Sequence, residues 1–278
     1  MRVIETVNEM ARWPRTGNIV LVPTMGALHE GHRKLIKTGK ALTQGEGNLI
    51  VSIYVNPTQF NDKEDFKAYP KTSEQDYEMC KEEEVDLIFC PSDNEMYSER
   101  ESVSVIEKRL ARHLCGSTRQ GHFDGVCTVV TKLFNIIRPT TAVFGKKDYQ
   151  QLAIIKQLVS DLNFSIEILG AETIREQNGL AISSRNRFLN TEERKQCHAI
   201  HKALVEMDLS NEKQCSELIT LGKSIIKSEA PLGRLDYLEI VDRQTMEPIQ
   251  TIDRPALAAM AIFFGNTRLI DNIEINSL

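Results

Sequence analysis

The sequence predicts an α/β fold: a Rossmann-like parallel sheet with helices on both faces, plus a smaller C-terminal α+β domain. In the first part of the chain, short and almost entirely apolar segments alternate with longer segments of helical periodicity, which is typical of parallel strands buried on both faces. After about Ile174 the pattern changes to helices followed by paired strands, which is typical of an α+β domain. We therefore expect one domain over 1–174 and a second over 175–278.

The expected elements follow from these patterns in chain order. The apolar segments predict strands over Ile19–Pro23, Leu49–Val55, Leu87–Cys90, Ala142–Phe144 and Ile166–Leu169. The segments between them predict helices over His32–Leu42, Thr72–Glu84, Val126–Ile137 and Gln150–Leu162. In the second domain we expect helices over Glu192–Met207 and Glu212–Lys227, then strands over Leu235–Val241, Ala258–Phe264 and Thr267–Ile275. The dipeptide Gly265-Asn266 predicts a hairpin turn between the last two strands.

Composition and charge argue against several classes of protein. Of the 278 residues, 41% are hydrophobic and 26% are charged, as in ordinary globular domains. The formal net charge of −5 argues against nucleic acid as the main partner, because nucleic-acid-binding domains are usually basic. No apolar run approaches the ~20 residues of a membrane-spanning helix, and the N-terminus lacks a signal-peptide pattern. The six cysteines form no C-x-x-C pair and do not cluster with histidines, which favours reduced thiols in a cytoplasmic protein over a zinc site.

One segment restricts the function more than any other. Thr24-Met25-Gly26-Ala27-Leu28-His29-Glu30-Gly31-His32 follows the first expected strand and leads into a helix. The first N–H groups of a helix have no partner within the helix, so they can bind an anion. Two imidazoles beside such a site suit chemistry on a phosphate near neutral pH. The alternative for either histidine alone is a structural role.

A second histidine pair, His198 and His201, has the same spacing as His29 and His32. This second pair has neither the preceding strand nor the intervening glycine, and it is expected in the middle of a helix. We therefore expect it to be structural.

Polar residues also follow another expected strand. Asn56 and Gln59 come directly after Leu49–Val55, and their amides both donate and accept hydrogen bonds. Such uncharged groups suit a substrate that carries hydroxyls or a carboxylate. An ordinary polar loop is the alternative.

A third cluster, Gly145 to Asp148, follows Ala142–Phe144. Glycine lets the backbone approach a ligand, a lysine here can hold a phosphate, and Asp148 can cap the next helix or accept from a ribose hydroxyl. Gln151 lies one helical turn beyond Asp148, on the same side. Because ligands of parallel sheets bind beyond the carboxyl ends of the strands, we expect all three clusters to converge at one edge of the sheet.

Two loops complete the set. Ser183, Ser184 and Arg185, followed by Arg187, bring hydroxyls and guanidinium groups together and predict a phosphate clamp, with an interdomain linker as the alternative. The segment Arg119–Val126 contains two glycines before a helix, and it suits a flexible flap or a plain surface loop equally well.

Taken together, these motifs resemble those of a known family. His29–His32 resembles the His-x-Gly-His signature of the nucleotidylyltransferase superfamily, and Ser183–Arg185 stands where that superfamily has a second phosphate-binding loop. The segments P-T-M-G-A-L-H-E-G-H, V-N-P-T-Q-F, A-Y-P-K-T, G-H-F-D-G-V, G-K-K-D-Y-Q-Q-L and G-L-A-I-S-S-R-N occur in the order and rough spacing of the pantothenate synthetase (pantoate–β-alanine ligase) family. The resemblance spans about Val20 to Leu189 and, more loosely, the rest of the chain.

The resemblance implies roles for particular residues. ATP would be bound by Met25, Gly26, Ala27, Leu28, His29, Glu30, Gly31, His32, Gly145, Lys146, Lys147, Asp148, Ile174, Ile182, Ser183, Ser184 and Arg185. Pantoate would contact Gln59 and Gln151, with Asn56 nearby, and Gln59 would also border the β-alanine site. His32 matches the family's proton donor. The groups expected to stabilise the charge of the reaction are His29, His32, Lys147, Ser183, Ser184 and Arg185.

The resemblance also implies the reaction and its setting. Pantoate would attack the α-phosphorus of ATP to give pantoyl adenylate and pyrophosphate, and the amine of β-alanine would then expel AMP to give pantothenate. Mg²⁺ would be held mainly by the ATP phosphates, with no protein ligand assigned. The protein would be a cytoplasmic homodimer whose second domain closes over the ATP site. The loop Arg119–Gly125 is a candidate lid that keeps water from the adenylate.

The chain departs from the family pattern at two positions. Lys146 stands where the family usually has an acidic residue, and Gln120 replaces the proline of R-P-G-H-F. We therefore expect the contact of the acidic side chain to be lost and the loop at Gln120 to be looser.

Other functions stay open at this point. A nucleotidylyltransferase acting on a phosphorylated alcohol would need more basic residues than Asn56, Gln59 and Gln151 offer. An aminoacyl-tRNA synthetase would need a basic RNA-binding region. A non-catalytic nucleotide-binding protein would bind ATP without releasing pyrophosphate.

Overall fold

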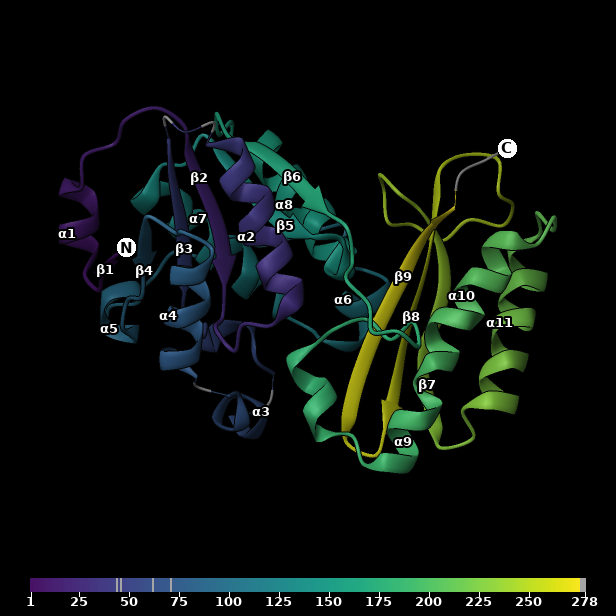
Figure 1. The fold of residues 1–278 in the computed structure, drawn as a ribbon. Coiled ribbons are helices and arrows are strands. Elements are labelled where there is room, and N and C mark those ends of the chain that lie inside the picture. The colour runs from purple at the N-terminus through teal and green to yellow at the C-terminus, as the bar shows by residue number, and fades with distance from the viewer. Residues whose placement is uncertain (44, 46, 62, 71, 276–278) are drawn as a thin grey trace. The chain divides into compact units, whose positions relative to one another are not determined.

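The computed structural model describes the chain except for residues 44, 46, 62, 71 and 276–278. The chain forms two compact units (Figure 1). Unit 1 comprises Met1–Glu107, Arg119–Lys146 and Ile154–Glu172; unit 2 comprises Lys108–Thr118, Lys147–Ala153 and Thr173–Leu278. Two short segments inside the first predicted range, 108–118 and 147–153, thus group with unit 2. The division of the chain at residue 174 stays a prediction.

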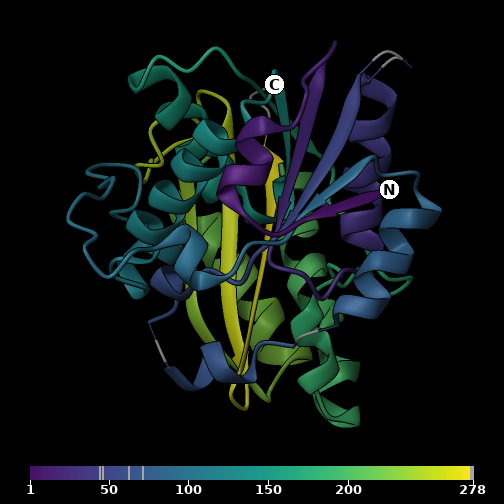
Figure 2. The ribbon, with the colours of Figure 1, turned by 90° about the vertical axis from the view of Figure 1, so that its left-hand side faces the viewer.

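Unit 1 contains a parallel six-stranded sheet in the order β1-β4-β3-β2-β5-β6, which confirms the predicted fold class. Its strands are β1 (Arg2–Ile4), β2 (Ile19–Thr24), β3 (Asn48–Ile53), β4 (Leu87–Phe89), β5 (Thr141–Gly145) and β6 (Glu167–Ala171). The short edge strand β1 was not predicted, because only Ile4 of its three residues is buried. Figure 2 shows the twist of the sheet, whose strands fan out from one another.

The strand order creates a switch point beside β2. The chain passes from β2 to β3 and β4 on one side and resumes with β5 on the other side of β2. The carboxyl ends of β2, β3 and β5 lie at one edge because these strands are parallel neighbours. Such switch points are the usual ligand sites of α/β sheets, and the convergence of the three polar clusters there stays a prediction.

Helices cover both faces of this sheet, as predicted. The helices of unit 1 are α1 (Val7–Arg12), α2 (Glu30–Leu42), α3 (Lys63–Ala68), α4 (Ser73–Glu82), α5 (Asp93–Met96), α7 (His122–Ile137) and α8 (Tyr149–Asp161), whose first residues belong to unit 2. Figures 1 and 2 place α2 and α4 on one face and α1 and α7 on the other. Val20 and Val22 of β2 are fully buried and pack in one cluster with Ile36 of α2 and Cys80 of α4.

Unit 2 is an antiparallel sheet in the order β7-β8-β9 with helices packed on it. Its elements are α6 (Leu114–Thr118), α9 (Thr191–Gln196), α10 (His198–Leu209), α11 (Cys215–Glu229), β7 (Gly233–Asp242), β8 (Ala256–Phe264) and β9 (Thr267–Ile275). Phe264 pairs with Thr267, which confirms the predicted hairpin. The single helix predicted over Glu192–Met207 is wrong: the helix breaks at Cys197, because the N–H of Ile200 bonds the Cys197 carbonyl only three residues back.

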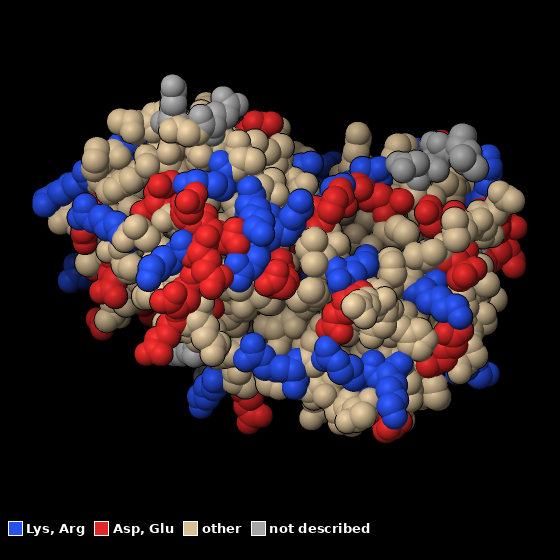
Figure 3. All heavy atoms as spheres, viewed as in Figure 1, with Lys and Arg blue, Asp and Glu red and all other residues tan. Residues whose placement is uncertain are grey.

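The surface over α2 and α4 carries charges of both signs (Figure 3). Arg33 of α2 forms ion pairs with Glu30, Glu82 and Glu83 at 3.0, 2.9 and 2.5 Å.

All six cysteines are free thiols. Among the described residues, no helix is both long and apolar enough to cross a membrane.

Candidate active site

His29 and His32 form the N-terminal cap of α2. His29 is the N-cap residue, and its Nδ1 accepts a hydrogen bond from the N–H of Gly31 at 3.2 Å. Nδ1 of His32 accepts from the N–H of His29 at 3.3 Å, so each imidazole satisfies a backbone donor of the first turn. A neutral imidazole whose Nδ1 accepts carries its proton on Nε2. The cap therefore makes both histidines Nε2–H donors beside the positive end of a helix, an arrangement suited to a phosphate.

The turn between β2 and α2 is held by Asp76 of α4. Gly26 and Ala27 both adopt left-handed backbone conformations, with φ of +76° and +50°, and such a conformation is unfavourable for alanine. The buried Asp76 carboxylate accepts from the N–H groups of Ala27 at 3.0 Å and Leu28 at 2.8 Å. A Cβ at residue 26 would lie 2.9 Å from that carboxylate, which is a second reason for glycine there. Asp76 therefore fixes the geometry that presents the two histidines.

The loop after β3 meets this turn directly. The short 3₁₀ helix Pro57–Gln59 follows β3, and Nε2 of Gln59 donates to Sδ of Met25 at 3.1 Å. The Gln59 carbonyl accepts from Nδ1 of His122 at 2.7 Å and from Nη2 of Arg119 at 3.3 Å. Asn56 and Gln59 are 1% and 8% exposed, so both amides lie in the interior of unit 1.

The segment Arg119–Gly125 includes the first turn of a helix, and its role as a lid stays a prediction. α7 begins at His122 rather than at Val126, and His122 is buried against Gln59. A Cβ at Gly125 would lie 2.5 Å from the Thr58 carbonyl oxygen, so the first turn of α7 packs directly on the Pro57–Gln59 backbone. Gly125 thus allows this close helix contact, whereas Gly121 is the N-cap residue in a left-handed conformation, with φ of +77°. The segment positions Gln59.

Lys146 forms an ion pair with Glu172. It follows Gly145 at the end of β5, and its Nζ lies 2.5 Å from Oε1 of Glu172 within unit 1. The departure that the sequence analysis noted at residue 146 is thus a lysine in an ion pair. Because Glu172 is largely exposed, we expect this pair to contribute little to stability.

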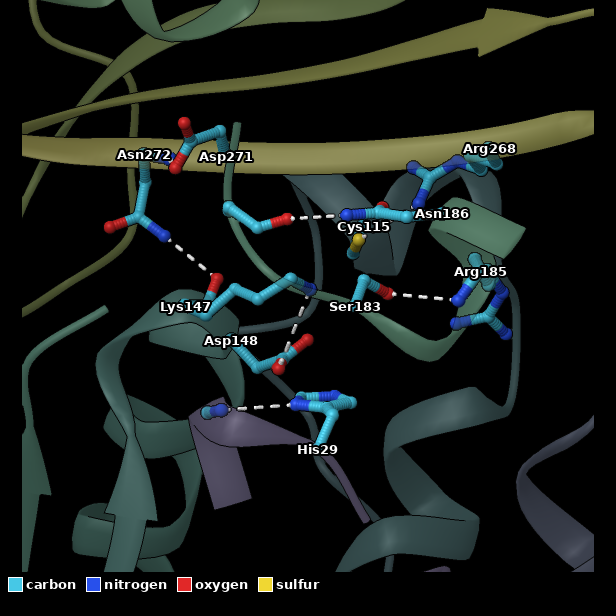
Figure 4. Close-up of polar contacts among 12 residues, drawn as sticks. His29, Cys115, Lys147, Asp148, Ser183, Arg185, Asn186, Arg268, Asp271 and Asn272 are labelled. Atoms are coloured by element: carbon cyan, nitrogen blue, oxygen red, sulfur yellow. Dashed lines mark hydrogen bonds and ion pairs between the residues drawn. The ribbon is translucent and has the colours of Figure 1, made fainter. Parts of the chain in front are cut away.

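In unit 2, Lys147 and Asp148 begin the segment that leads into α8 (Figure 4). The Lys147 carbonyl accepts from Nδ2 of Asn272 on β9 at 2.8 Å, and the Lys147 ammonium lies 3.9 Å from the Asp148 carboxylate. The buried Gln150 donates to the carbonyls of residues 110 and 113 at 2.8 Å, which ties this segment to 108–118. Gln151 is half-buried beside it.

The loop predicted as a phosphate clamp is a well-anchored turn of unit 2. Ile182 donates its N–H to the Ile174 carbonyl at 3.0 Å, which brings together two residues predicted at the ATP site. Ser183 caps the 3₁₀ helix Ser184–Phe188, and its Oγ accepts from the N–H of Arg185 at 3.3 Å (Figure 4). The buried Asn186 donates to the Ala181 carbonyl at 3.1 Å. The hydroxyls and the Arg185 guanidinium are therefore carried on a fixed backbone.

The sequence interpretation missed three residues that hold this site. Asp76 and Cys80 are spaced i, i+4 on the buried side of α4, so a carboxylate at an otherwise buried position was the available signal for Asp76. Tyr97 comes soon after β4, the neighbour of β3, so the strand-end rule could have included it. His122 lies in a segment that the sequence analysis singled out, but nothing in the sequence assigned it a contact with Gln59.

No metal ligand set is evident. Among the residues that the structure describes, no cluster of three or more His, Cys, Asp or Glu side chains could hold an ion.

Comparison with known proteins gives a consistent result. The model of the pantoate–β-alanine ligase family matches residues 2–274. The pantothenate synthetase of Akkermansia muciniphila is 48% identical over 260 residues, covering 93% of this chain and 92% of the relative. That of Thermosipho africanus is 47% identical over 290 residues, covering 99% and 100%.

Solved structures match as well. The pantothenate synthetase of Thermus thermophilus has a TM-score of 0.93 and 39% identity, with both chains fully covered. The pantoate–β-alanine ligase of Francisella tularensis, crystallised with β,γ-ATP and β-alanine, has a TM-score of 0.80 and 34% identity, with 98% and 97% covered.

Proposed function

The chain belongs to the pantoate–β-alanine ligase family, and from that premise we propose how its residues carry out the ATP-dependent ligation of pantoate and β-alanine. The observation that carries the proposal is the histidine cap of α2. It aims two Nε2–H donors from a helix N-terminus at the carboxyl end of β2, where a nucleotide phosphate suits both the dipole and the donors.

The first proposed step is attack of the pantoate carboxylate on the α-phosphorus of ATP. Negative charge grows on the phosphoryl oxygens and on the leaving pyrophosphate, and fixed donors stabilise that charge without reorganising. His29 and His32 supply two donors, with His32 as proton donor. Lys147, Ser183, Ser184 and Arg185 supply the others, and their fixed backbone in unit 2 supports this role. The remaining residues proposed to contact ATP are Met25, Gly26, Ala27, Leu28, Glu30, Gly31, Gly145, Lys146, Asp148, Ile174 and Ile182.

The second step is attack of the β-alanine amine on the carbonyl of the pantoyl adenylate, with AMP as leaving group. We propose that Gln59 and Gln151 bind pantoate, that Asn56 lies behind Gln59, and that Gln59 borders the β-alanine site. Uncharged amides suit this task because a strong positive partner would weaken the carboxylate as a nucleophile. The burial of Asn56 and Gln59 supports a site from which water is excluded.

The setting of the reaction is also a proposal. Mg²⁺ would be bound mainly through the ATP phosphates, because Mg²⁺ usually keeps few protein ligands at nucleotide sites. We propose a cytoplasmic homodimer, and closure of the C-terminal unit over ATP. The free cysteines support the cytoplasmic location.

Pyrophosphate release from Mg-ATP by the purified protein tests the function, with pantoate and β-alanine omitted in turn. We expect release to require pantoate, and AMP and pantothenate to appear only when β-alanine is added. Release that requires a phosphorylated alcohol instead would establish a nucleotidylyltransferase. ATP binding without release under any combination would leave a non-catalytic role.

A further inference from the structure

We propose that Tyr97 is a positioning residue for substrate recognition: its hydroxyl acts through Asn56 to hold the Gln59 amide with its NH₂ group toward the substrate. The proposal rests on the pantoate-binding role of Gln59 proposed above. It assigns a role to a residue at the C-terminal end of α5, outside every segment that the sequence analysis singled out.

The starting point is the orientation of Asn56, which the Gly125 carbonyl and two hydroxyl donors fix together. Nδ2 of Asn56 lies 3.2 Å from the Gly125 oxygen, and a carbonyl oxygen can only accept. The NH₂ group of Asn56 must therefore face Gly125, and its Oδ1 must face the opposite way. Oδ1 of Asn56 accepts hydrogen bonds from two hydroxyls, that of Tyr97 at 2.7 Å and that of Thr58 at 3.0 Å.

The orientation of Gln59 follows from that of Asn56. Nδ2 of Asn56 donates its second hydrogen to Oε1 of Gln59 at 3.0 Å. The Gln59 amide is thereby held with its oxygen toward Asn56 and with its NH₂ group on the other side, where the thioether of Met25 is a weak acceptor. A substrate carboxylate or hydroxyl is a far better acceptor, so the relay prepares Gln59 to donate.

The relay is needed because the other constraints on Gln59 leave its amide free to turn over. His122 and Arg119 fix the Gln59 carbonyl, which is a main-chain group. An amide rotated by 180° has nearly the same shape, so packing alone does not select one orientation. With the NH₂ group toward Asn56, Gln59 would present Oε1 to the substrate and repel a carboxylate.

Tyr97 is suited to be a donor at the start of this relay. Burial raises the pKa of Tyr97, so the hydroxyl keeps its proton at neutral pH. The Tyr97 N–H also bonds the Asp93 carbonyl at 2.7 Å, which holds the residue at the end of α5. Because Asn56 is almost fully buried, water cannot readily replace the lost hydroxyl.

The test is Tyr97→Phe, with Tyr54→Phe as matched control. The two rings are neighbours, with centroids 6.4 Å apart, but the Tyr54 hydroxyl donates to Asp93 at 3.0 Å instead. We expect Tyr97→Phe to raise the KM for pantoate by about two- to tenfold, the effect of one buried hydrogen bond, with the KM for ATP unchanged. Tyr54→Phe should leave the KM for pantoate unchanged.

A second variant keeps the test independent of folding. Thr58→Val removes the other hydroxyl, and Tyr97→Phe/Thr58→Val should raise the KM for pantoate more than either change alone, at an unchanged KM for ATP. Equal effects of Tyr97→Phe and Tyr54→Phe, or equal changes in both KM values, would overturn the relay. A wild-type protein that shows no pantoate-dependent turnover would instead refute the proposed function, so the two failures are distinguishable.

Discussion

Two histidine pairs with identical spacing have different surroundings in this protein. His29 and His32 lie at the start of α2, where both Nδ1 atoms accept from backbone N–H groups. His198 lies at the start of α10, but its Nδ1 contacts the Lys195 carbonyl at 2.8 Å and its Nε2 contacts Glu229 at 3.2 Å. Nδ1 of His201 is buried without a hydrogen-bond partner, 3.8 Å from Asp271. Contrary to the prediction, the second pair is not in the middle of a helix.

The comparison shows that the backbone group next to a histidine determines which ring nitrogen carries the proton and can donate it to a ligand. In the first pair, backbone N–H groups at the start of α2 occupy Nδ1, so the proton of a neutral imidazole stays on Nε2. Nδ1 of His198 contacts the Lys195 carbonyl, which can only accept a hydrogen bond, so the proton of His198 is on Nδ1. Spacing in the sequence is shared by both pairs and therefore carries no chemical information by itself.

The largest expected effect is that of His29→Asn. Asparagine is a good N-cap residue, so it keeps the helix cap while removing the Nε2–H donor. By analogy with a lost oxyanion donor, we expect kcat to fall by about 10²–10³. The measurement is pantoate-dependent pyrophosphate release, with thermal unfolding to verify that stability is unchanged.

His29→Ala is the informative companion to this variant. It removes the cap as well as the donor, so it should lose a further ~1 kcal/mol of stability at a similar kcat. If His29→Asn retained wild-type turnover, the role of His29 would be capping alone, and the contrast between the pairs would be structural.

Asp76→Asn should have the next largest effect, because Asp76 holds the turn that presents the first pair. An amide has a single acceptor oxygen, and its NH₂ group would face a backbone N–H of Ala27 or Leu28. We expect a loss of about 1–3 kcal/mol in the free energy of unfolding by urea, and lower turnover. Asp86→Asn is the control: Asp86 accepts from the N–H of Leu49 at 2.8 Å, away from the histidines, and should not change turnover. A similar loss of turnover in both variants would contradict this role.

Features that depend on neighbouring residues could be predicted from the sequence, and contacts between distant residues could not. Strands β2 to β6 and the hairpin of β8 and β9 were predictable because burial leaves a local pattern, and His29 and His32 because strand, glycine and helix are adjacent. Asp76 and Tyr97 act on Ala27 and Asn56 from far along the chain, and only packing brings them together. The helical turn at His122 and the close packing of Gly125 could not be predicted for a similar reason, since glycine permits both mobility and close contact.

A smaller effect is expected from the protonation of His201, which should make the free energy of unfolding depend on pH. Burial lowers the pKa of His201 from its usual value of 6.5, with the Arg175 charge as a lesser cause. The unfolded chain therefore takes up this proton at a higher pH than the folded chain does. The resulting stability is fully present above about pH 6.5 and is lost as the pH falls toward the lowered pKa. Urea unfolding at pH 7.5, 6.5 and 5.5 should show a steeper loss for the wild type than for His201→Gln; equal slopes would contradict it.

The smallest expected effect is that of His198→Gln, and it is the sharpest test of the comparison. His198 is 38% exposed and pairs with a surface glutamate, and ion pairs at such positions contribute little. We expect pyrophosphate release to be unchanged within error, with the melting temperature hardly moved. His198→Gln removes an imidazole from the same i, i+3 spacing that His29→Asn disrupts. If it lowered turnover as His29→Asn does, spacing rather than the helix cap would determine function, and the distinction between the two pairs would fail.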